Sequence, residues 1–276
     1  MKKTTRLIAA ILSLSVLIPT FVACGKTPPI ADLGGDTSVE SSDTTITVPE
    51  ETPPLETPVP APPKAEKAQY LQCTGNGVYF RSGAGTSFAK VGSAQKGETY
   101  AVVGKSGNWY ETYYRGKKVY ISASYVSLLS LEKHENDKVE NVLQEGYKLL
   151  GVPYVYGAVR FHDGKGNLLG GFNAQKFDCS SLVQYVFYKG AKAVLDVTTR
   201  TQVVQGKYVK ANDLQRGDCM YFTNESRKHL TGVQRVGHVA IYLGDNYILH
   251  TASDYARIEK ISATRWGYFL EARRFT

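Results

Sequence analysis

Proline and aromatic residues are distributed very unevenly along this chain of 276 residues. Residues 24–68 hold nine of the 11 prolines, many threonines and glutamates, and no aromatic side chain. A segment of this composition cannot bury enough apolar surface to offset the entropy that it loses on ordering. We therefore predict that residues 24–68 are a disordered Pro/Thr-rich tether, and that folding is confined to the rest of the chain.

Residues 1–23 have the pattern of an export signal. A basic start is followed by an almost wholly apolar run at residues 7–23. The small residues before Cys24, in "FVACGK", resemble a bacterial lipobox, in which this cysteine becomes the lipid attachment site. An uncleaved membrane anchor is the alternative, although about 17 residues interrupted by Pro19 are at the lower limit for spanning. Either interpretation predicts an extracytoplasmic protein, and the first predicts a lipid anchor in the cell membrane, facing the cell wall.

Charge divides the chain in the same way. The tether holds three lysines and eight acidic residues, so the region after it is more basic than the whole-chain net charge of +8 implies. That region also holds 30 of the 31 aromatic residues. A basic, aromatic-rich head attracts anionic partners. Because the head is exported and tethered, we expect a cell-wall polymer rather than nucleic acid, and we predict no obligate protein partner.

Residues 69–130 read as short strands separated by glycine-rich turns, which predicts a small β-barrel. The segments "FRSGAGTSF", "KGETYAVVG" and "GNWYETYYRGKKVYISASYV" resemble a bacterial SH3 domain. Tyr79 stands where that family usually has Asn, and Val119 stands where it usually has Gly. The resemblance implies a module that binds cell wall or packs beside a catalytic domain.

The pattern becomes helical after residue 131. In "HENDKVENVLQEGYKLLG", apolar residues recur at steps of three and four, which predicts an amphipathic helix. Gly151 and Pro153 provide a stop signal for this helix. A second apolar stripe, formed by Leu182, Val183, Val186 and Phe187, predicts another helix directly after "FDCSS".

Cys179 lies at the start of that second helix. Asp178 is placed to cap the helix, so the cysteine falls in the first turn, where the helix N-terminus favours a thiolate and unpaired N–H groups can hold an oxyanion. These features favour Cys179 as a nucleophile. The alternatives are that it is a buried small hydrophobe, half of a disulfide or a metal ligand. Of the other cysteines, Cys219 reads as a buried strand residue and Cys73 is uninformative.

A cysteine nucleophile needs a base, and His238 and His250 lie in the β-hairpin "GHVAIYLGDNYILHTAS". A two-residue loop at 244–245 places the two rings on opposite faces. A three-residue loop at 243–245 pairs them directly, so that one imidazole orients the other. A zinc site built from the same residues is the rival chemistry, but the short paired spacings of structural zinc sites are missing.

Four segments in this order, "LLGVPYVYG", "KFDCSSLVQYVF", "LQRGDCMYF" and "GHVAIYLGDNYILHTAS", resemble the NlpC/P60 family of cell-wall cysteine peptidases. The resemblance implies a papain-like α+β catalytic domain over residues 131–276, preceded by the SH3-like barrel. It implies that Cys179 is the nucleophile, His238 the general base and His250 the orienting residue. It also implies that Tyr154, Asp178, Ser180 and Arg200 bind substrate, and that no metal or other cofactor is needed. Gln202 replaces a serine of the family's Arg-x-Ser segment.

Two loops are longer than is usual in the family, at residues 158–175 and 223–236. We expect both to flank the active-site cleft and to shape access for an anionic glycopeptide. The expected reaction is hydrolysis of the bond between γ-D-glutamyl and the following diamino acid in peptidoglycan stem peptides, through an acyl-enzyme. The alternatives are an N-acetylmuramoyl-L-alanine amidase or a cross-bridge peptidase on the same fold, and a non-catalytic wall-binding protein.

Overall fold

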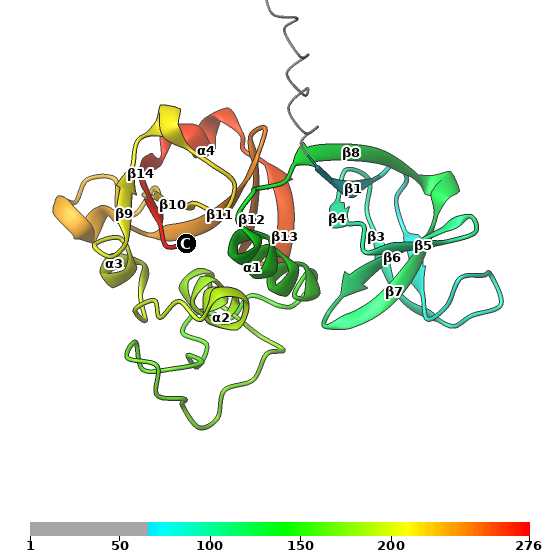
Figure 1. Cartoon of the computed structure of the whole chain (residues 1–276), viewed down its shortest axis with the longest axis horizontal. Helices are drawn as coiled ribbons and strands as arrows, with labels where there is room; N and C mark the ends of the chain where they lie inside the picture. Colours follow the sequence, from blue (N-terminus) through cyan, green and yellow to red (C-terminus); the bar gives the residue numbers. More distant parts are fainter. Residues whose placement is uncertain (1–65) are drawn as a thin grey trace, which may run out of the picture. The chain divides into compact units, whose positions relative to one another are not determined.

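The computed structural model describes residues 66–276, which fall within one compact unit (Figure 1). The predicted signal, the lipid-attachment residue Cys24 and the tether up to residue 65 lie outside the described residues. The predicted boundary of the tether at residue 68 is wrong, because Lys67 and Ala68 belong to a β-strand, Lys67–Cys73. Within residues 66–276 no helix combines the length and the apolar character needed to cross a bilayer.

Fourteen strands and four α-helices make up the described part of the chain, with three short 3₁₀ turns between them. The strands are β1 (Lys67–Cys73), β2 (Val78–Arg81), β3 (Lys90–Ala94), β4 (Thr99–Ala101), β5 (Gly104–Ser106), β6 (Trp109–Tyr114), β7 (Lys117–Ser122), β8 (Val126–Glu132), β9 (Lys207–Val209), β10 (Cys219–Phe222), β11 (His238–Gly244), β12 (Tyr247–Ala252), β13 (Tyr255–Lys260) and β14 (Phe269–Arg274). The helices are α1 (Asp137–Lys148), α2 (Cys179–Ala191), α3 (Thr199–Gln202) and α4 (Ala263–Gly267).

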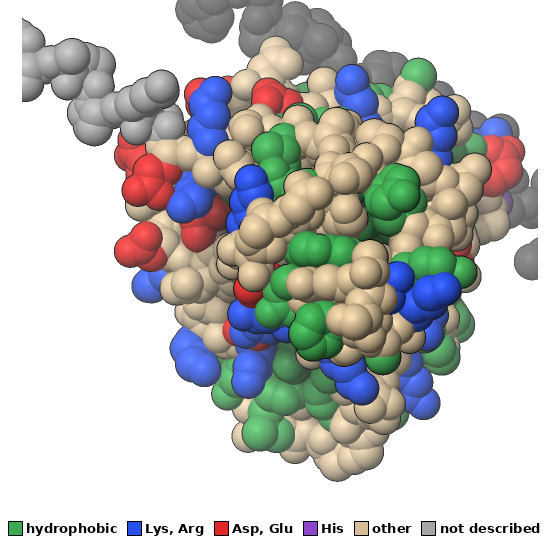
Figure 2. Space-filling view, turned by 90° about the vertical axis from the view of Figure 1, so that its right-hand side faces the viewer, with side chains coloured by type: hydrophobic (Ala, Val, Ile, Leu, Met, Phe, Trp, Pro, Cys, Tyr) green, Lys and Arg blue, Asp and Glu red, His purple; other side chains and the backbone are tan. Residues whose placement is uncertain are grey.

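The first eight strands form the predicted barrel. A five-stranded sheet in the order β3-β2-β7-β6-β5 faces strands β1, β4 and β8 of a second sheet. Val119, the departure from the usual glycine, is buried in the barrel core, and Tyr79 is about half exposed with the Lys90 ammonium 3.8 Å from its ring centre. Both departures are therefore accommodated without disturbing the fold. Lysine and arginine side chains are spread among hydrophobic ones on the face in Figure 2.

The second sheet has nine strands in the order β8-β1-β4-β13-β12-β11-β10-β14-β9. Barrel strand β4 meets β13 of the C-terminal region at a single antiparallel pair, Thr99 with Ile258. The sequence predicted two units but gave no sign that they share a sheet.

Helices α1 and α2 pack against each other, and α2 also packs on strands β11 and β12 (Figure 1). The predicted stripe of α2 is fully buried, since Leu182, Val183, Val186 and Phe187 have no exposed surface. Each such side chain contributes roughly 1.5–3 kcal/mol of burial free energy. Gly190 permits the close approach of the helices, because a Cβ there would lie 2.4 Å from the backbone nitrogen of Val142. This packing fixes the start of α2 against the sheet.

A buried polar cluster links β1 to α1 and to the turn before β10. Arg216 donates to both carboxylate oxygens of Glu140, at 2.6 and 3.0 Å, and to the hydroxyls of Tyr70 and Tyr147, each at 2.9 Å. Its Nη1 also donates to the carbonyl of Leu243 at 2.9 Å. Every polar atom of this cluster has a partner, so it holds the barrel strand and the C-terminal region together. We name these residues, Tyr70, Glu140, Tyr147 and Arg216, the arginine cluster.

Candidate active site

Cys179 is the first residue of helix α2, as the sequence predicted. Asp178 is the N-cap: its Oδ1 accepts from the Ser181 backbone N–H at 2.9 Å, and the Ser181 hydroxyl accepts from the Asp178 N–H at 2.9 Å. This reciprocal pair is a capping box, which fixes the first turn of the helix. The capped turn and the buried stripe behind it hold the cysteine in one place.

The Cys179 sulfur lies against strand β11. Its side chain is largely buried, and the backbone N–H groups of Val239 and Ser180 interact with its sulfur. Val239 directly follows His238, so the packing of α2 on β11 brings the cysteine next to the histidine strand. The two regions are 59 positions apart in the sequence.

Helix placement alone does not make this thiol acidic. Burial, followed by the negative charge of Asp178, raises the Cys179 pKa to about 11, although the N–H groups of Val239 and Ser180 lower it. The expectation that the helix N-terminus favours a resting thiolate is therefore wrong, because desolvation of the charged form outweighs it. Forming the thiolate requires a base that accepts the proton.

The histidine hairpin forms, but in neither of the two predicted registers. Tyr242 lies opposite Ile248 and Gly244 opposite Tyr247, with a bulge between Tyr242 and Gly244. The loop is Asp245–Asn246, and both residues have positive φ, at 47° and 64°. This register leaves even-numbered residues opposite even-numbered ones, so His238 and His250 share a face as diagonal neighbours.

The two imidazoles are hydrogen bonded. His238 Nε2 lies 2.8 Å from His250 Nδ1, and the rings meet nearly edge to face, with an angle of 79° between their planes. His250 is almost completely buried, and His238 is partly exposed. Burial lowers the pKa of both rings, and for His238 the neighbouring His250 and Arg265 lower it further. Both histidines are therefore neutral near pH 7, so His238 is able to accept a proton.

Tyr154 stands beside the cysteine, in the segment before the long loop. Its side chain lines two adjoining cavities, one that includes Cys179 and one that includes His238. Burial, followed by the proximity of Cys179 and Asp178, raises the Tyr154 pKa to about 12. The phenol is protonated at neutral pH and available as a hydrogen-bond donor.

Asp178 and Ser180 are buried beside the cysteine, but their polar atoms have protein partners. Asp178 Oδ2 accepts from Arg160 Nη1 at 2.8 Å and from the Gly157 N–H at 3.2 Å. The Ser180 hydroxyl donates to Asp178 Oδ1 and accepts from Arg160 Nη2. The geometry thus gives both residues a part in holding the site, and their contact with substrate stays a prediction.

Arg200 lies on the short helix α3 and lines the same cavity as Cys179. Gln202, two positions later, is fully buried and donates from its amide to the carbonyl oxygens of Ser180 and Asp196. The glutamine therefore ties α3 to the first turn of α2. Its side chain is too buried to take over a recognition role at the surface.

Both long loops border the cavity that contains Cys179, which has a volume of about 460 Å³. The loop at 158–175 supplies Arg160, and the loop at 223–236 supplies Asn224, Ser226 and Arg227. Within residues 66–276, no carboxylate lies within ion-pair distance of Arg200 or Arg227, whereas Arg160 is paired with Asp178. The cavity thus has an excess of positive charge.

The cysteines of residues 66–276 form no disulfide with one another. Cys73, Cys179 and Cys219 are all free and buried, and Cys219 is a fully buried strand residue, as predicted. Among residues 66–276, no cluster of three or more His, Cys, Asp or Glu side chains has the arrangement of a metal site.

Two residues of the site were missed by sequence reasoning. Arg160 was included only as part of a long loop, and Glu259 was not considered. Glu259 Oε1 lies 3.2 Å from His250 Nε2 and accepts from Arg265 Nη2 at 2.8 Å. The signal in the sequence was the alternation of polar side chains in "YARIEK", which places Tyr255, Arg257 and Glu259 on one face of a strand.

Two segments of the chain match models of known domain families. Residues 151–274, which contain the cysteine and both histidines, match the model of the NlpC/P60 family. Residues 151–274 form an NlpC/P60 domain. Residues 76–127 match the bacterial SH3 domain model, so an SH3 domain precedes the NlpC/P60 domain in the chain.

Curated relatives of the NlpC/P60 domain are named as a hydrolase, a dipeptidyl-peptidase and a peptidoglycan endopeptidase. The chain is 30% identical over 151 residues to a Gamma-DL-glutamyl hydrolase of Bacillus subtilis, covering 54% of this chain and 32% of that protein. It is 28% identical over 132 residues to a Gamma-D-glutamyl-L-lysine dipeptidyl-peptidase of the same organism, covering 48% and 38%. It is 29% identical over 113 residues to the Peptidoglycan endopeptidase RipA of Mycolicibacterium smegmatis, covering 41% and 21%. The chain thus spans less than two-fifths of the length of these relatives.

Solved structures of NlpC/P60 proteins are also similar. An NlpC/P60 family protein of Bacillus cereus is 18% identical with a TM-score of 0.40, covering 75% of this chain and 63% of that one. A Staphylococcus aureus protein described as similar to a lipoprotein of the same family is 26% identical with a TM-score of 0.41, covering 55% and 46%.

Proposed function

We propose that this protein is a peptidoglycan endopeptidase that hydrolyses the bond between γ-D-glutamyl and the following diamino acid of stem peptides. Cys179 is the nucleophile, His238 the general base and acid, and His250 the residue that orients His238. The names of the relatives support peptidoglycan as the substrate and the γ-D-glutamyl linkage as the bond.

One observation carries the proposal: a cysteine at a capped helix start lies against the strand that begins with His238, whose other ring nitrogen is occupied by His250. His238 Nε2 is bonded to His250 Nδ1 at 2.8 Å, which leaves His238 Nδ1 as the nitrogen available to the cysteine. A nucleophile, a base and a group that orients the base are the three parts that covalent acyl transfer requires.

The first half of the reaction forms a thioester. The proton of the Cys179 thiol passes to His238 Nδ1 as the sulfur attacks the γ-carbonyl carbon of the D-glutamyl residue. The resulting oxyanion receives hydrogen bonds from the neutral Tyr154 hydroxyl and from the backbone N–H of Cys179, which has no intrahelical acceptor at the start of α2. The C–N bond then breaks, and His238 gives its proton to the departing amine.

The second half releases the acyl group. His238, neutral again, takes a proton from water, and the water oxygen attacks the thioester carbon. The C–S bond breaks, and Cys179 leaves as a thiolate that recovers the proton from His238. The products are a free γ-carboxylate on D-glutamate and a peptide with a new amino terminus.

The charge of the cavity fits an anionic substrate. Arg160, Arg200 and Arg227 come from three separate segments, and the one carboxylate among the lining residues, Asp178, is buried. Stem peptides carry free carboxylates near the bond to be cut. We therefore assign both long loops a role in attracting and positioning these carboxylates.

Residues 1–65 complete the proposal. An export signal, lipid attachment at Cys24 and a long tether hold the two domains outside the membrane and let them reach the wall. The SH3 domain either binds wall or helps to position it at the cleft.

Mass analysis of muropeptides tests the function. Peptidoglycan is incubated with the full chain or with its Cys179→Ala variant, and the soluble products are identified. The proposal expects release of fragments that end in D-glutamate from wild type only. Bare glycan strands would instead indicate an amidase, and opened cross-links with intact stems a cross-bridge peptidase. Equal binding of sacculi without release by either protein would indicate a wall-binding module.

The long loops have their own test. Deleting residues 163–171, which lie beyond Arg160, is expected to change the ratio of rates on small muropeptides and intact sacculi. If the deletion variant and wild type have the same ratio of rates on the two substrates, the loop has no role in substrate access.

A further inference from the structure

Glu259 on β13 is the next member of a chain of polar contacts that begins at His238 on β11. His238 contacts His250 at 2.8 Å, His250 Nε2 lies 3.2 Å from Glu259 Oε1, and that oxygen accepts from Arg265 at 2.8 Å. The arrangement follows from the pairing of β12 with β13, in which His250 lies opposite Arg257 and is diagonal to Glu259.

Glu259 is ionised at neutral pH. Burial alone would raise its pKa, but His250 and the guanidiniums of Arg265 and Arg257 outweigh that effect and lower the pKa to about 2. An ionised carboxylate only accepts hydrogen bonds. Whatever faces Oε1 must therefore be a donor.

This requirement decides where the histidine protons lie. His250 Nε2 is buried and has no hydrogen-bond partner within residues 66–276, and the negative charge of the Glu259 carboxylate, whose Oε1 lies 3.2 Å away, stabilises a proton there. The opposite tautomer would point a nitrogen lone pair at the carboxylate, which is repulsive. With the proton on Nε2, His250 Nδ1 is an acceptor, and His238 must donate to it from its own Nε2.

We propose that Glu259 is a positioning residue that fixes the tautomers of both histidines, so that His238 Nδ1 carries the lone pair that accepts the Cys179 proton. Its effect on catalysis rests on the proposed function, whereas its effect on the tautomers does not. Glu259 touches neither the cysteine nor the cavity that contains it, and acts through His250.

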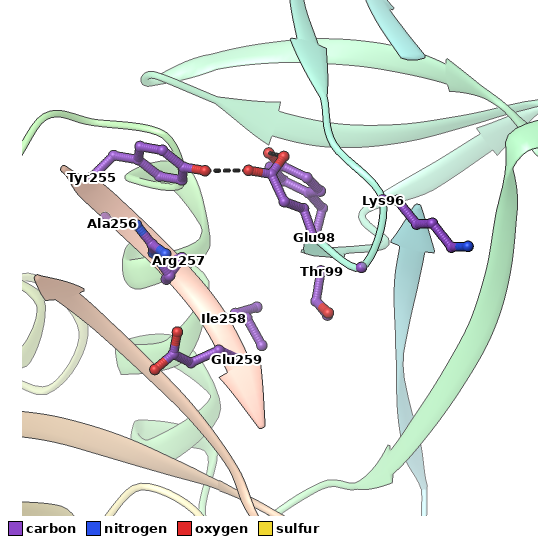
Figure 3. A pocket seen from close by; sticks show the side chains of 10 residues that line it. Lys96, Glu98, Thr99, Tyr255, Ala256, Arg257, Ile258 and Glu259 are labelled. Carbon is purple, nitrogen blue, oxygen red and sulfur yellow. Dashed lines mark hydrogen bonds between the residues drawn. The ribbon is translucent and has the colours of Figure 1, made fainter. Parts of the chain in front are cut away.

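Glu259 also lines a cavity of about 270 Å³ between the SH3 domain and β13 (Figure 3). Lys96, Glu98 and Thr99 border this cavity from one side, and the Tyr255 hydroxyl donates to Glu98 across it. The Glu259 side chain is 30% exposed. Solvent thus reaches the carboxylate, which explains how a charge is maintained next to a buried imidazole.

The competing explanation is a structural one, in which Glu259 serves only to tie Arg265 of α4 to β13. Three variants separate the two. Glu259→Leu removes the acceptor, Glu259→Gln keeps an acceptor oxygen without the charge, and Arg265→Met removes the ion pair but leaves the carboxylate. Glu145→Leu is the matched control, because Glu145 is a partly buried carboxylate on α1 that is paired with Lys148 and makes no hydrogen bond or ion pair with either histidine.

The first readout is nitrogen-15 NMR of the histidine rings in the full chain without substrate, with resonances assigned by His238→Gln and His250→Gln. Wild type, Glu259→Gln and Glu145→Leu are expected to show His238 and His250 protonated at Nε2 and bare at Nδ1. Glu259→Leu is expected to show loss of that single pattern for His250. A wild-type His250 protonated at Nδ1, or an unchanged pattern in Glu259→Leu, overturns the proposal.

The second readout is kinetic. Glu259→Leu is expected to lower kcat by about 10- to 100-fold with KM within about twofold, as loss of a carboxylate behind a functional histidine does elsewhere. Glu259→Gln is expected to recover most of kcat. Equal losses in Glu259→Leu and Arg265→Met, with tautomers unchanged in both, assign Glu259 the structural role. If Glu259→Leu does not fold, the tautomers of wild type and Glu259→Gln still decide the question, and if the chain is not an enzyme, the NMR result stands alone.

Discussion

The arginine cluster and the cluster of Cys179, His238 and His250 are both polar, and both are built on the central sheet. They differ in how many of their polar atoms have hydrogen-bond partners. Arg216 makes five hydrogen bonds, and the hydroxyls that it reaches are also bonded to each other at 2.6 Å. In the other cluster, one ring nitrogen of His238 is hydrogen bonded, and burial raises the pKa of the Cys179 thiol. A cluster in which every polar atom has a hydrogen-bond partner is suited to holding two domains together. A cluster with a ring nitrogen that has no partner is suited to exchanging protons.

The largest expected effect is on activity. Cys179→Ala is expected to lower turnover by on the order of 10³-fold or more, because covalent catalysis fails as a unit when its nucleophile is lost. Cys219→Ala is the control, since Cys219 is also buried but has no role in the mechanism. Hydrolysis of a stem-peptide substrate measures both. Comparable activity in the two variants would remove the cysteine from the mechanism.

The next effect is on stability. Arg216→Met leaves the Glu140 carboxylate and two tyrosine hydroxyls buried without their donor, which we expect to cost about 3–5 kcal/mol of unfolding free energy. Urea denaturation measures it, and the double variant Arg216→Met/Glu140→Leu is expected to recover part of the loss. Under native conditions the single variant should keep kcat, because no member of the arginine cluster touches Cys179 or the histidines. A loss of kcat with unchanged stability would contradict the division between the clusters.

Asp178 lies next to Cys179, yet both of its carboxylate oxygens have hydrogen-bond partners, as in the arginine cluster. It therefore tests whether a residue beside the nucleophile has a structural role. Asp178→Ala removes the N-cap acceptor and the partner of Arg160, which we expect to cost about 1–2 kcal/mol. Asp178→Asn keeps the cap and is expected to cost less. Thermal unfolding of both variants gives the comparison, and an equal cost would show that the charge, rather than the cap, is what matters.

The smallest effect is a displacement of the pH profile. His238 must be neutral to accept the cysteine proton, and its pKa is lowered well below 6.5 by burial, His250 and Arg265. Activity is therefore expected to persist as the pH falls below 6.5 and to be lost only as the pH falls through this lowered pKa. The dependence of kcat/KM on pH measures it. An acidic limb centred above pH 7 would mean that the ring is not desolvated as described.

Local patterns were enough to predict the parts of the fold that depend on local physics. The stripe of α2, the cap at Asp178 and the strand character of the hairpin all follow from period and capping chemistry, and each is confirmed. The register of the hairpin was not predictable in the same way, because the bulge near Leu243 is allowed by the turn residues but not required by them.

The site was predictable where the family resemblance supplied the residues, and less so where tertiary packing sets the chemistry. The lowered acidity of Cys179 comes from burial, which a sequence does not display. Arg160 and Glu259 reach the site from a loop and a strand that are linked to it only by folding. The pairing of β4 with β13 also depends on folding, and it was not predictable because a single residue pair leaves no pattern in the sequence.

The central claim is that the Cys179 sulfur and the His238 ring act as one proton-exchanging pair. The most direct measurement is the rate of alkylation by iodoacetamide at pH 7, followed by peptide mass spectrometry, in wild type and His238→Ala. The account predicts that Cys179 is labelled at least about tenfold faster than Cys73 and Cys219, and that this advantage is lost in His238→Ala. Labelling of Cys179 that is no faster than that of the other two cysteines, or that is unaffected by His238→Ala, would contradict it.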